Sequence, residues 1–210
     1  MLKVGVLVSG NGTNLQAVLD ACASGALDAR VVVLVADRRS AFALERARQA
    51  GVPTAVVRPR DFPDRDAFDG ALGLACVRAG AELVVHAGFM RIVGPRYLDL
   101  WEGRCINVHP ALLPAFPGLD APGQAIAYGA RITGCTVHFV DRGVDTGPII
   151  LQEAVRIAPD DTAESLHRRI QDVEWRLLPQ AIALFGAGRL QVRGRVVRIL
   201  EEVEGACPAR

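Results

Sequence analysis

The sequence lacks paired cysteines, long apolar runs and an excess of charge of either sign. Its five cysteines are odd in number and show no C-x-x-C spacing, so neither a disulfide framework nor a cysteine zinc site is expected. No segment reaches about 18 uninterrupted apolar residues, and the N-terminus lacks the layout of a signal peptide, which favours the cytoplasm and no membrane contact. The net charge of +1 gives no reason to expect nucleic acid as a partner.

The sequence does contain enough apolar material for a sizeable core. It has 210 residues, 50% of them hydrophobic, and this length suits a single domain. Short valine-rich runs, typical of strands buried on both faces, lie at 3–8, 30–36, 54–57 and 82–87. Segments with helical spacing of apolar residues alternate with them, at 14–24, 40–51 and 64–80. This alternation predicts a doubly wound α/β fold with a mostly parallel sheet.

Residues that favour helix starts precede several of these segments. Ser40 and Asp64 are of the types that cap the first turn of a helix, and each segment ends at a glycine. A long helix is expected at about 161–187, where Asp161 and Glu164 have the spacing of a capping box. These signals divide the helical segments from the strands around them.

The second half of the chain is expected to continue the same sheet. Further strands are predicted at 104–109, 132–140 and 148–157, and a hairpin that turns near Gly194-Arg195 should follow the long helix. We find no internal repeat, low-complexity segment or linker. The sequence therefore predicts one domain over 1–210, with a C-terminal hairpin or tail at about 188–210.

The loop "SGNGTN" at 9–14 lies between the first strand and the first helix. Gly10 and Gly12 allow close approach of a ligand to the backbone, and the helix N-terminus behind them presents free N–H groups. A dinucleotide fingerprint is not present, because Leu15 takes the place of its third glycine. The loop therefore suits one phosphate of a small ligand, although a plain strand-to-helix turn would also explain it.

Asn107 and His109 form the second group of candidate residues. They are two apart in an expected strand, so they share a face, and Pro110 should end the strand at the carboxyl edge of the sheet. An amide can donate to a carbonyl oxygen, and an imidazole can donate or move a proton. A carboxylate from the loop 140–148, either Asp141 or Asp145, could orient His109 or a water molecule. A structural asparagine and a packed histidine are the alternative.

The other histidines and the cysteines give weaker signals. His86 and His138 each lie within an expected strand, where a hydrogen-bonded core or surface histidine is the commoner case. No pair of histidines has H-x-x-x-H spacing, so no metal is expected. Cys105 and Cys135 are interpreted as small core residues.

Taken together, these segments resemble the phosphoribosylglycinamide formyltransferases, also called GAR transformylases. The resemblance runs in order over about 3–190, with no large insertion, and implies the Rossmann-like formyltransferase fold. The matching stretches are "VGVLVSGNGTNLQAVLDA", "ALERARQAGVPT", "HAGFMRIVGP", "INVHPALLPAFPGLDAPGQA" and "GCTVHFVDRGVDTGPIILQ".

The resemblance implies transfer of a formyl group from 10-formyltetrahydrofolate to the amino group of glycinamide ribonucleotide, a step of de novo purine synthesis. Asn107, His109 and Asp145 match the catalytic trio of the family, and Asp145 rather than Asp141 aligns because it precedes Thr146-Gly147-Pro148. Asn107 and a charged His109 would stabilise the oxyanion, and Asp145 would hold the charge and assist proton transfer. A monomer or a homodimer is expected.

The same resemblance implies the residues that bind the two ligands. Glu174 would hold the ribose and amine end of the nucleotide. Its phosphate would be bound by Gly12, Thr13, Asn14 and Arg65. The folate would be bound by Met90, Arg91, Ile92, Val93, Asn107, Val140, Asp141 and Val144. For Met90 and the neighbouring Phe89, packing in the core is an equal alternative.

The sequence departs from the family in two places, and it has rivals. Asp120 and Pro122 follow Gly118 where some members carry histidines, and His86 stands where many members have an aliphatic residue. Methionyl-tRNA formyltransferases and formyltetrahydrofolate hydrolases share the Asn-x-His element, but they would add a C-terminal or an N-terminal domain for which little of this chain remains. A phosphate-binding module without activity is the rival from another class.

Overall fold

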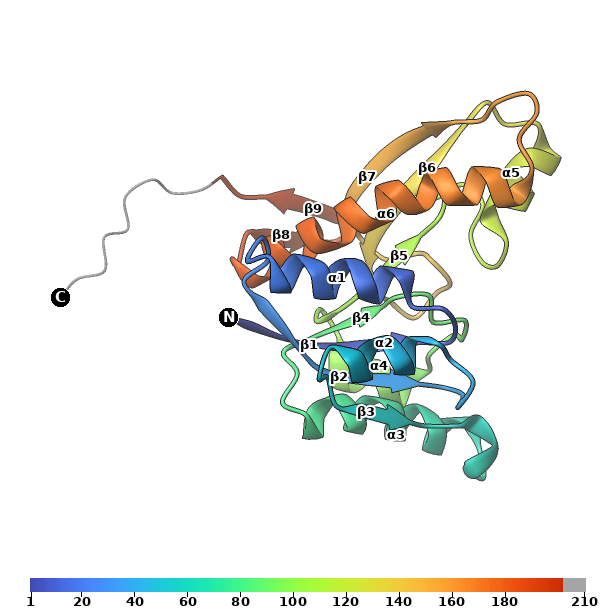
Figure 1. The fold of residues 1–210 in the computed structure, drawn as a ribbon. Helices are drawn as coiled ribbons and strands as arrows, with labels where there is room; N and C mark the ends of the chain where they lie inside the picture. Colours follow the sequence, from blue (N-terminus) through green and yellow to red (C-terminus); the bar gives the residue numbers. More distant parts are fainter. Residues whose placement is uncertain (202–210) are drawn as a thin grey trace.

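The computed structural model describes residues 1–201, so the expectations for the last residues of the tail, and for Cys207, lie outside the described part. Nine strands form one sheet in the order β3-β2-β1-β4-β5-β6-β7-β9-β8 (Figure 1). The strands are β1 (Leu2–Val8), β2 (Ala29–Ala36), β3 (Thr54–Val56), β4 (Leu83–His86), β5 (Cys105–His109), β6 (Ile132–Phe139), β7 (Ile149–Arg156), β8 (Leu190–Arg193) and β9 (Val196–Ile199).

The first five strands are parallel, and the direction changes once β5 is reached. β1 pairs with β2 and β4, β2 with β3, and β4 with β5, all in parallel. β6 then runs antiparallel to both β5 and β7, while β9 pairs in parallel with β7 and forms a hairpin with β8. The predicted mostly parallel α/β sheet is confirmed.

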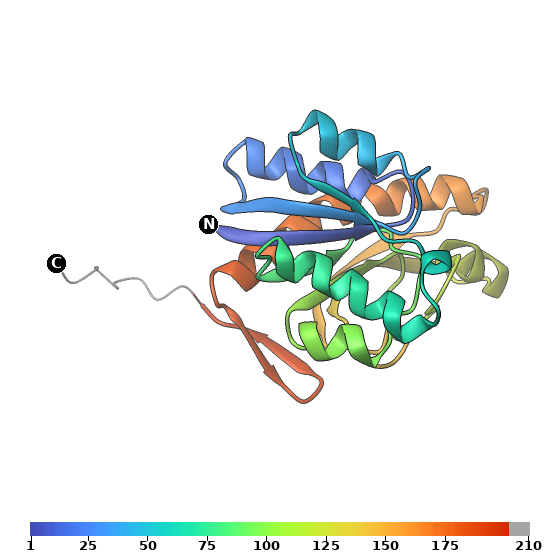
Figure 2. The same ribbon diagram turned by 90° about the horizontal axis from the view of Figure 1, so that it is seen from below.

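Helices cover both faces of this sheet (Figure 2). They are α1 (Thr13–Ala23), α2 (Ala43–Gln49), α3 (Arg65–Arg78), α4 (Pro95–Trp101), α5 (Ala121–Tyr128) and α6 (Ala163–Gly186), with a short 3₁₀ turn η1 at Pro59–Asp61. The buried apolar residues of α1, α2 and α6 pack in one cluster with β1 and its neighbours. Those of α3 and α4 form a second cluster on the other face. The expected buried positions of Cys105 and Cys135 are confirmed.

Two expected helix starts are corrected by the structure. The second helix begins at Ala43 and not at Ser40, since the residues before it turn against the loop after β1, where Ala43 N donates to Gly10 O at 3.2 Å. The capping box of α6 is formed by Thr162 and Ser165, not by Asp161 and Glu164. Asp64 does cap α3, because its side chain accepts a hydrogen bond from Ala67 N.

Two helices, α4 and α5, were not expected from the sequence. Both begin with a proline in the first turn, where the missing N–H costs nothing. Asp120 caps α5 by accepting a hydrogen bond from Gly123 N. This residue, at which the sequence differs from some members of the family, therefore has a structural role. Within residues 1–201, no helix has the length and apolar character needed to span a bilayer.

Candidate active site

A cleft of about 1080 Å³ opens at the carboxyl ends of β1, β4 and β5. It is lined by the loop after β1, the segment after β4, the end of β5, the loop between β6 and β7, and one side of α6. Parallel strands present their carboxyl ends at one edge, which is where open α/β sheets bind ligands. Every residue proposed from the sequence for catalysis or for ligand binding lines this single cleft.

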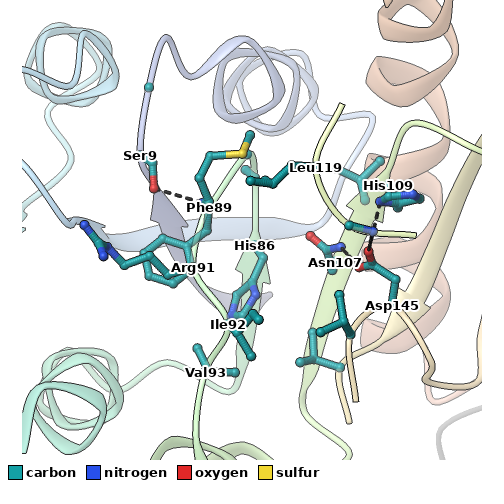
Figure 3. A pocket seen from close by; sticks show the side chains of 18 of the residues that line it. Ser9, His86, Phe89, Arg91, Ile92, Val93, Asn107, His109, Leu119 and Asp145 are labelled. Carbon is teal, nitrogen blue, oxygen red and sulfur yellow. Dashed lines mark hydrogen bonds and ion pairs between the residues drawn. The ribbon is translucent and has the colours of Figure 1, made fainter. Parts of the chain in front are cut away.

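Asp145 joins Asn107 and His109 into one cluster (Figure 3). Its Oδ2 lies 3.4 Å from His109 Nδ1 and accepts a 2.8 Å hydrogen bond from Gly118 N, while its Oδ1 lies 3.4 Å from Asn107 Nδ2. Asp145 has a φ of 53°, in the left-handed region that few side chains adopt. Asp141 instead bonds within its own loop, to Thr146 Oγ1 and Gly143 N. The geometry therefore brings Asp145, not Asp141, to His109.

His138 belongs to this cluster, although its sequence context suggested only a hydrogen-bonded core or surface histidine. Its Nδ1 lies 2.8 Å from Phe139 O, and because a carbonyl can only accept, this nitrogen must carry a hydrogen. In the neutral ring, Nε2 is then an acceptor, and it faces Asn107 Nδ2 at 3.1 Å. His138 therefore fixes which end of the Asn107 amide is turned toward it.

Both ring nitrogens of His109 face acceptors. Nε2 lies 2.8 Å from Phe116 O, and Nδ1 faces Asp145. This arrangement suits a doubly protonated ring. Burial nevertheless lowers the pKa of His109, and the opposing effects of Asp145 and the Phe116 carbonyl do not reverse that direction. The charged His109 expected from the sequence is therefore not the form that burial favours in the free protein.

Asp145 is held ionised by its neighbours. Burial raises the pKa of this carboxyl group, but the adjacent His138 ring, 3.6 Å from Oδ1, the hydrogen bond from Gly118 N and the interaction with His109 lower it further than burial raises it. An ionised Asp145 among two imidazoles can accept a proton or share one. The cluster therefore has an amide, two imidazoles and a carboxylate, which is the equipment for general acid–base chemistry.

The loop after β1 has the backbone expected of an anion site. Gly12 is the N-cap of α1 with a φ of 76°, and a Cβ added there would approach Ala43 Cβ to 2.5 Å, so only glycine fits. Asn14 is buried, and its Nδ2 donates to Glu174 Oε2 at 2.8 Å. The other amide atom, Oδ1, is buried without a partner. Burial raises the pKa of Glu174 to about 7, opposed by the Asn14 bond.

Two arginines join the segment after β4 to helix α3 and to the end of β2. Arg65 donates to Ile92 O at 2.5 Å and lies 3.6 Å from Asp69, whose carboxylate also accepts from Gly94 N. Arg91 pairs with buried Asp37 at 2.5 Å. Both arginines therefore have protein partners that fix their positions, and both line the cleft.

The apolar part of the cleft is formed by exposed side chains. Met90 and Ile92 are 57% and 56% exposed, whereas Phe89 is buried at 8%. The alternative of core packing is therefore correct for Phe89 and wrong for Met90. Val140 and Val144 face the same space from the β6–β7 loop.

Comparison with known proteins places this cleft in context. Residues 2–182 match the formyl transferase family. A phosphoribosylglycinamide formyltransferase from Mycobacterium tuberculosis is 47% identical over 198 residues, which are 94% of this chain and 91% of that protein. The crystal structure of glycinamide ribonucleotide transformylase 1 from Symbiobacterium toebii has 52% identity and a TM-score of 0.94, covering 96% of this chain and 95% of that one.

Longer proteins also contain a related segment. A trifunctional purine biosynthetic protein adenosine-3 from Drosophila pseudoobscura pseudoobscura is 44% identical over 191 residues, or 90% of this chain. The match spans only 14% of the length of that relative.

Proposed function

The chain belongs to the formyl transferase family, and we propose that it transfers the formyl group of 10-formyltetrahydrofolate to the amino group of glycinamide ribonucleotide, in the cytoplasm. The observation that carries this proposal is that one cleft contains both a phosphate-type loop at Gly12 and the Asn107–His109–Asp145 cluster. A phosphorylated amine and a formyl donor need both of these features in one space.

The two ligands would occupy opposite ends of the cleft. The N–H groups at the start of α1 and the guanidinium of Arg65 suit the phosphate of the nucleotide. Glu174, with its pKa near neutrality, would accept hydrogen bonds from the ribose or the amine. The exposed apolar side chains of Met90, Ile92 and Val144 suit the flat ring of the folate, which must pass close to Asn107.

The chemical step begins when the amine nitrogen attacks the formyl carbon and the carbonyl electron pair moves onto the formyl oxygen. Asn107 Nδ2 can donate to this oxygen once it gives up a present partner, and the longer contact, 3.4 Å to Asp145, is the one we expect to break. His109 keeps its Phe116 contact and stabilises the oxyanion as a nearby positive charge when protonated.

Proton transfer then completes the reaction. Asp145, released from Asn107, would accept the amine proton, directly or through water, and deliver it to N10 of the folate. The electron pair on the formyl oxygen re-forms the carbonyl as the bond from the formyl carbon to the protonated N10 breaks, and the products are the formylated ribonucleotide and tetrahydrofolate. Atoms and charges balance without a metal ion or a redox cofactor.

The test is a spectrophotometric assay of 10-formyltetrahydrofolate turnover with glycinamide ribonucleotide, without it, and with the unphosphorylated riboside. Turnover that requires the ribonucleotide, and is much slower with the riboside, is the expected result. Turnover without any amine would assign a hydrolase activity instead. Binding of both ligands with no turnover, unchanged in Asn107→Ala, would contradict an enzymatic role.

A further inference from the structure

His86 has no role in the proposed reaction, yet it lies beside the residues that do. In the register of the sheet, His86 on β4 pairs with Asn107 on β5, and Asn107 pairs with His138 on β6. Directly opposed residues share a face, so the three side chains form a row across three strands. His86 is 5% exposed and lines the cleft.

Two fully buried groups hold one side of the His86 ring. Nε2 lies 3.0 Å from Tyr97 Oη and 3.4 Å from Cys105 Sγ, and these two atoms are 3.4 Å apart. Burial raises the pKa of Tyr97 well above its ordinary value and that of Cys105 to about 12, so both keep their protons. Burial lowers the pKa of His86 to about 3, so the ring stays neutral.

These contacts determine where the single ring proton lies. The buried Tyr97 hydroxyl needs an acceptor, and an imidazole nitrogen is a far better one than a thiol sulfur. Tyr97 therefore donates to Nε2, and the ring proton of His86 is on Nδ1. Within residues 1–201, Nδ1 has no hydrogen-bond partner. It is also not one of the fully buried polar atoms that lack a partner, so it must be accessible to solvent. It is thus a neutral donor that remains open to the cleft.

The place of this donor relates it to one of the two ligands. Figure 3 shows His86 between the 89–93 segment and Asn107, and its ring centroid lies 5.4 Å from that of Phe89. His86 therefore adjoins the segment that carries the exposed apolar side chains of Met90 and Ile92. In an apolar pocket, a few placed polar groups fix the orientation of the ligand.

We propose that His86 is a specificity-determining residue, whose Nδ1–H donates a hydrogen bond to an acceptor atom on the pteridine ring of the folate. This inference rests on the proposed function, because it assumes that a folate occupies the cleft. An aliphatic side chain at the same place would offer contact but no donor. His86 would therefore favour ring systems that place a hydrogen-bond acceptor next to its Nδ1.

Calorimetric titration with tetrahydrofolate, which carries no formyl group to transfer, tests the contact apart from catalysis. His86→Leu removes the donor, and His86→Asn leaves an amide N–H close to the position of Nδ1. Both variants lose the bond to Tyr97, so they form a matched pair. We expect His86→Leu to weaken tetrahydrofolate binding roughly 3- to 10-fold, as for one neutral hydrogen bond, and His86→Asn to restore part of the loss.

Binding of glycinamide ribonucleotide is the internal control and should be equal in the wild type and in both variants. Nitrogen-15 NMR of the histidine rings supplies a second measurement that a purely structural role would not move. The wild type should show a protonated Nδ1, and its signal should shift when tetrahydrofolate binds. Tyr97→Phe, which removes the hydrogen bond to Nε2, should mix the two tautomers.

The proposal is overturned if His86→Leu binds tetrahydrofolate as the wild type does and only unfolds more easily. It is also overturned if NMR shows that Nε2 carries the proton in the complex, or if the wild type does not bind tetrahydrofolate. Failure of the proposed function gives a different pattern. Tetrahydrofolate binding that depends on His86, with no formyl transfer to glycinamide ribonucleotide, would leave this inference standing.

Discussion

At the scale of single residues, the cluster depends on which atoms donate and which accept. His138 Nε2 accepts from Asn107, and Asp145 accepts from Gly118 while facing His109. Replacing one of these four polar side chains by another of similar size would change which atoms donate and which accept. The four residues are Asn107, His109, His138 and Asp145. The chemistry is therefore encoded in hydrogen positions as much as in residue types.

Asp145→Asn should lower kcat on the order of a hundredfold or more, because it removes a positioned proton acceptor while keeping the size of the side chain. An amide can still accept from Gly118, so the loop should stay in place. Steady-state kinetics measure the effect, with thermal unfolding as the control for folding. A loss of less than about threefold would be inconsistent with the proton-transfer role.

His138→Leu should also slow the reaction, through the orientation of Asn107. Without the acceptor at 3.1 Å, the amide is free to rotate, and a misplaced group costs up to roughly 100-fold in rate. The matched control is His167→Leu, since His167 also lines the cleft but lies on helix α6, away from the strands that carry Asn107 and His138. For His138→Leu we expect kcat to fall with little change in KM. For His167→Leu we do not expect this fall. Equal kinetics of the two variants would contradict the orienting role.

Part of this cluster could be predicted from the sequence, and the reason is periodicity. Asn107 and His109 are two apart in a strand that ends at a proline, so their common face follows from strand geometry alone. The spacing did not decide between Asp141 and Asp145, because the choice depends on the left-handed backbone of Asp145. His138 was missed because the antiparallel register of β5 and β6 is a long-range property.

At the scale of elements, the loop between β6 and β7 carries Asp145, the proposed proton acceptor, and a glycine lies at its end. A Cβ added to Gly147 would collide with the backbone oxygen of Phe139, and a backbone atom cannot move aside as a side-chain end can. Phe139 N in turn donates to Pro148 O at 2.9 Å, so the two ends of the loop are tied together. The position of Asp145 therefore depends on the close approach at Gly147.

Gly147→Ala should lower the free energy of unfolding by about 1–3 kcal/mol, as overpacking does, and should also reduce kcat by displacing Asp145. Urea denaturation and steady-state kinetics measure the two effects. Gly70→Ala is the matched control, because a Cβ there meets only the far end of Arg96, at 3.8 Å, inside helix α3. The free energy of unfolding of that control should rise by about 0.5–1 kcal/mol. Equal stabilities of the two variants would contradict the close approach.

Sequence patterns located most of the elements but not their exact starts. The valine-rich runs matched strands because burial on both faces requires continuous apolar residues. Helices α4 and α5 were missed because each is short and begins with proline, which the sequence patterns read as a break. At α6, four polar residues could form the cap, and only the structure shows that Thr162 and Ser165 do so.

At the scale of the whole molecule, two buried groups make stability depend on pH in opposite directions. Burial raises the pKa of Glu174 to about 7 and lowers that of His86 to about 3. For Glu174, the favourable contribution is complete below its unfolded pKa of about 4.5 and is lost as the pH rises through 7. For His86, stability is lost as the pH falls below its unfolded pKa of about 6.5.

Glu174→Gln should therefore flatten the decline of stability between pH 4.5 and pH 7, by an amount on the order of 3 kcal/mol. Urea unfolding of the wild type and the variant at several pH values measures the difference. Glu153→Gln, which changes a partly exposed carboxylate paired with Arg176, is the control and should leave the pH dependence nearly unchanged. Parallel pH curves for the wild type and Glu174→Gln would show that folding does not raise the pKa of Glu174.

The contacts of Arg65 have a consequence for how the affinities of the two ligands depend on each other. This side chain is proposed to hold the nucleotide phosphate, and it also donates to Ile92 O, in the segment proposed to hold the folate. Asp69 contacts the same arginine and accepts from Gly94 N, so the proposed phosphate site and the proposed folate site are joined through one network of contacts. Thermodynamic linkage then requires reciprocity: whatever factor the nucleotide imposes on folate affinity, the folate must impose on nucleotide affinity.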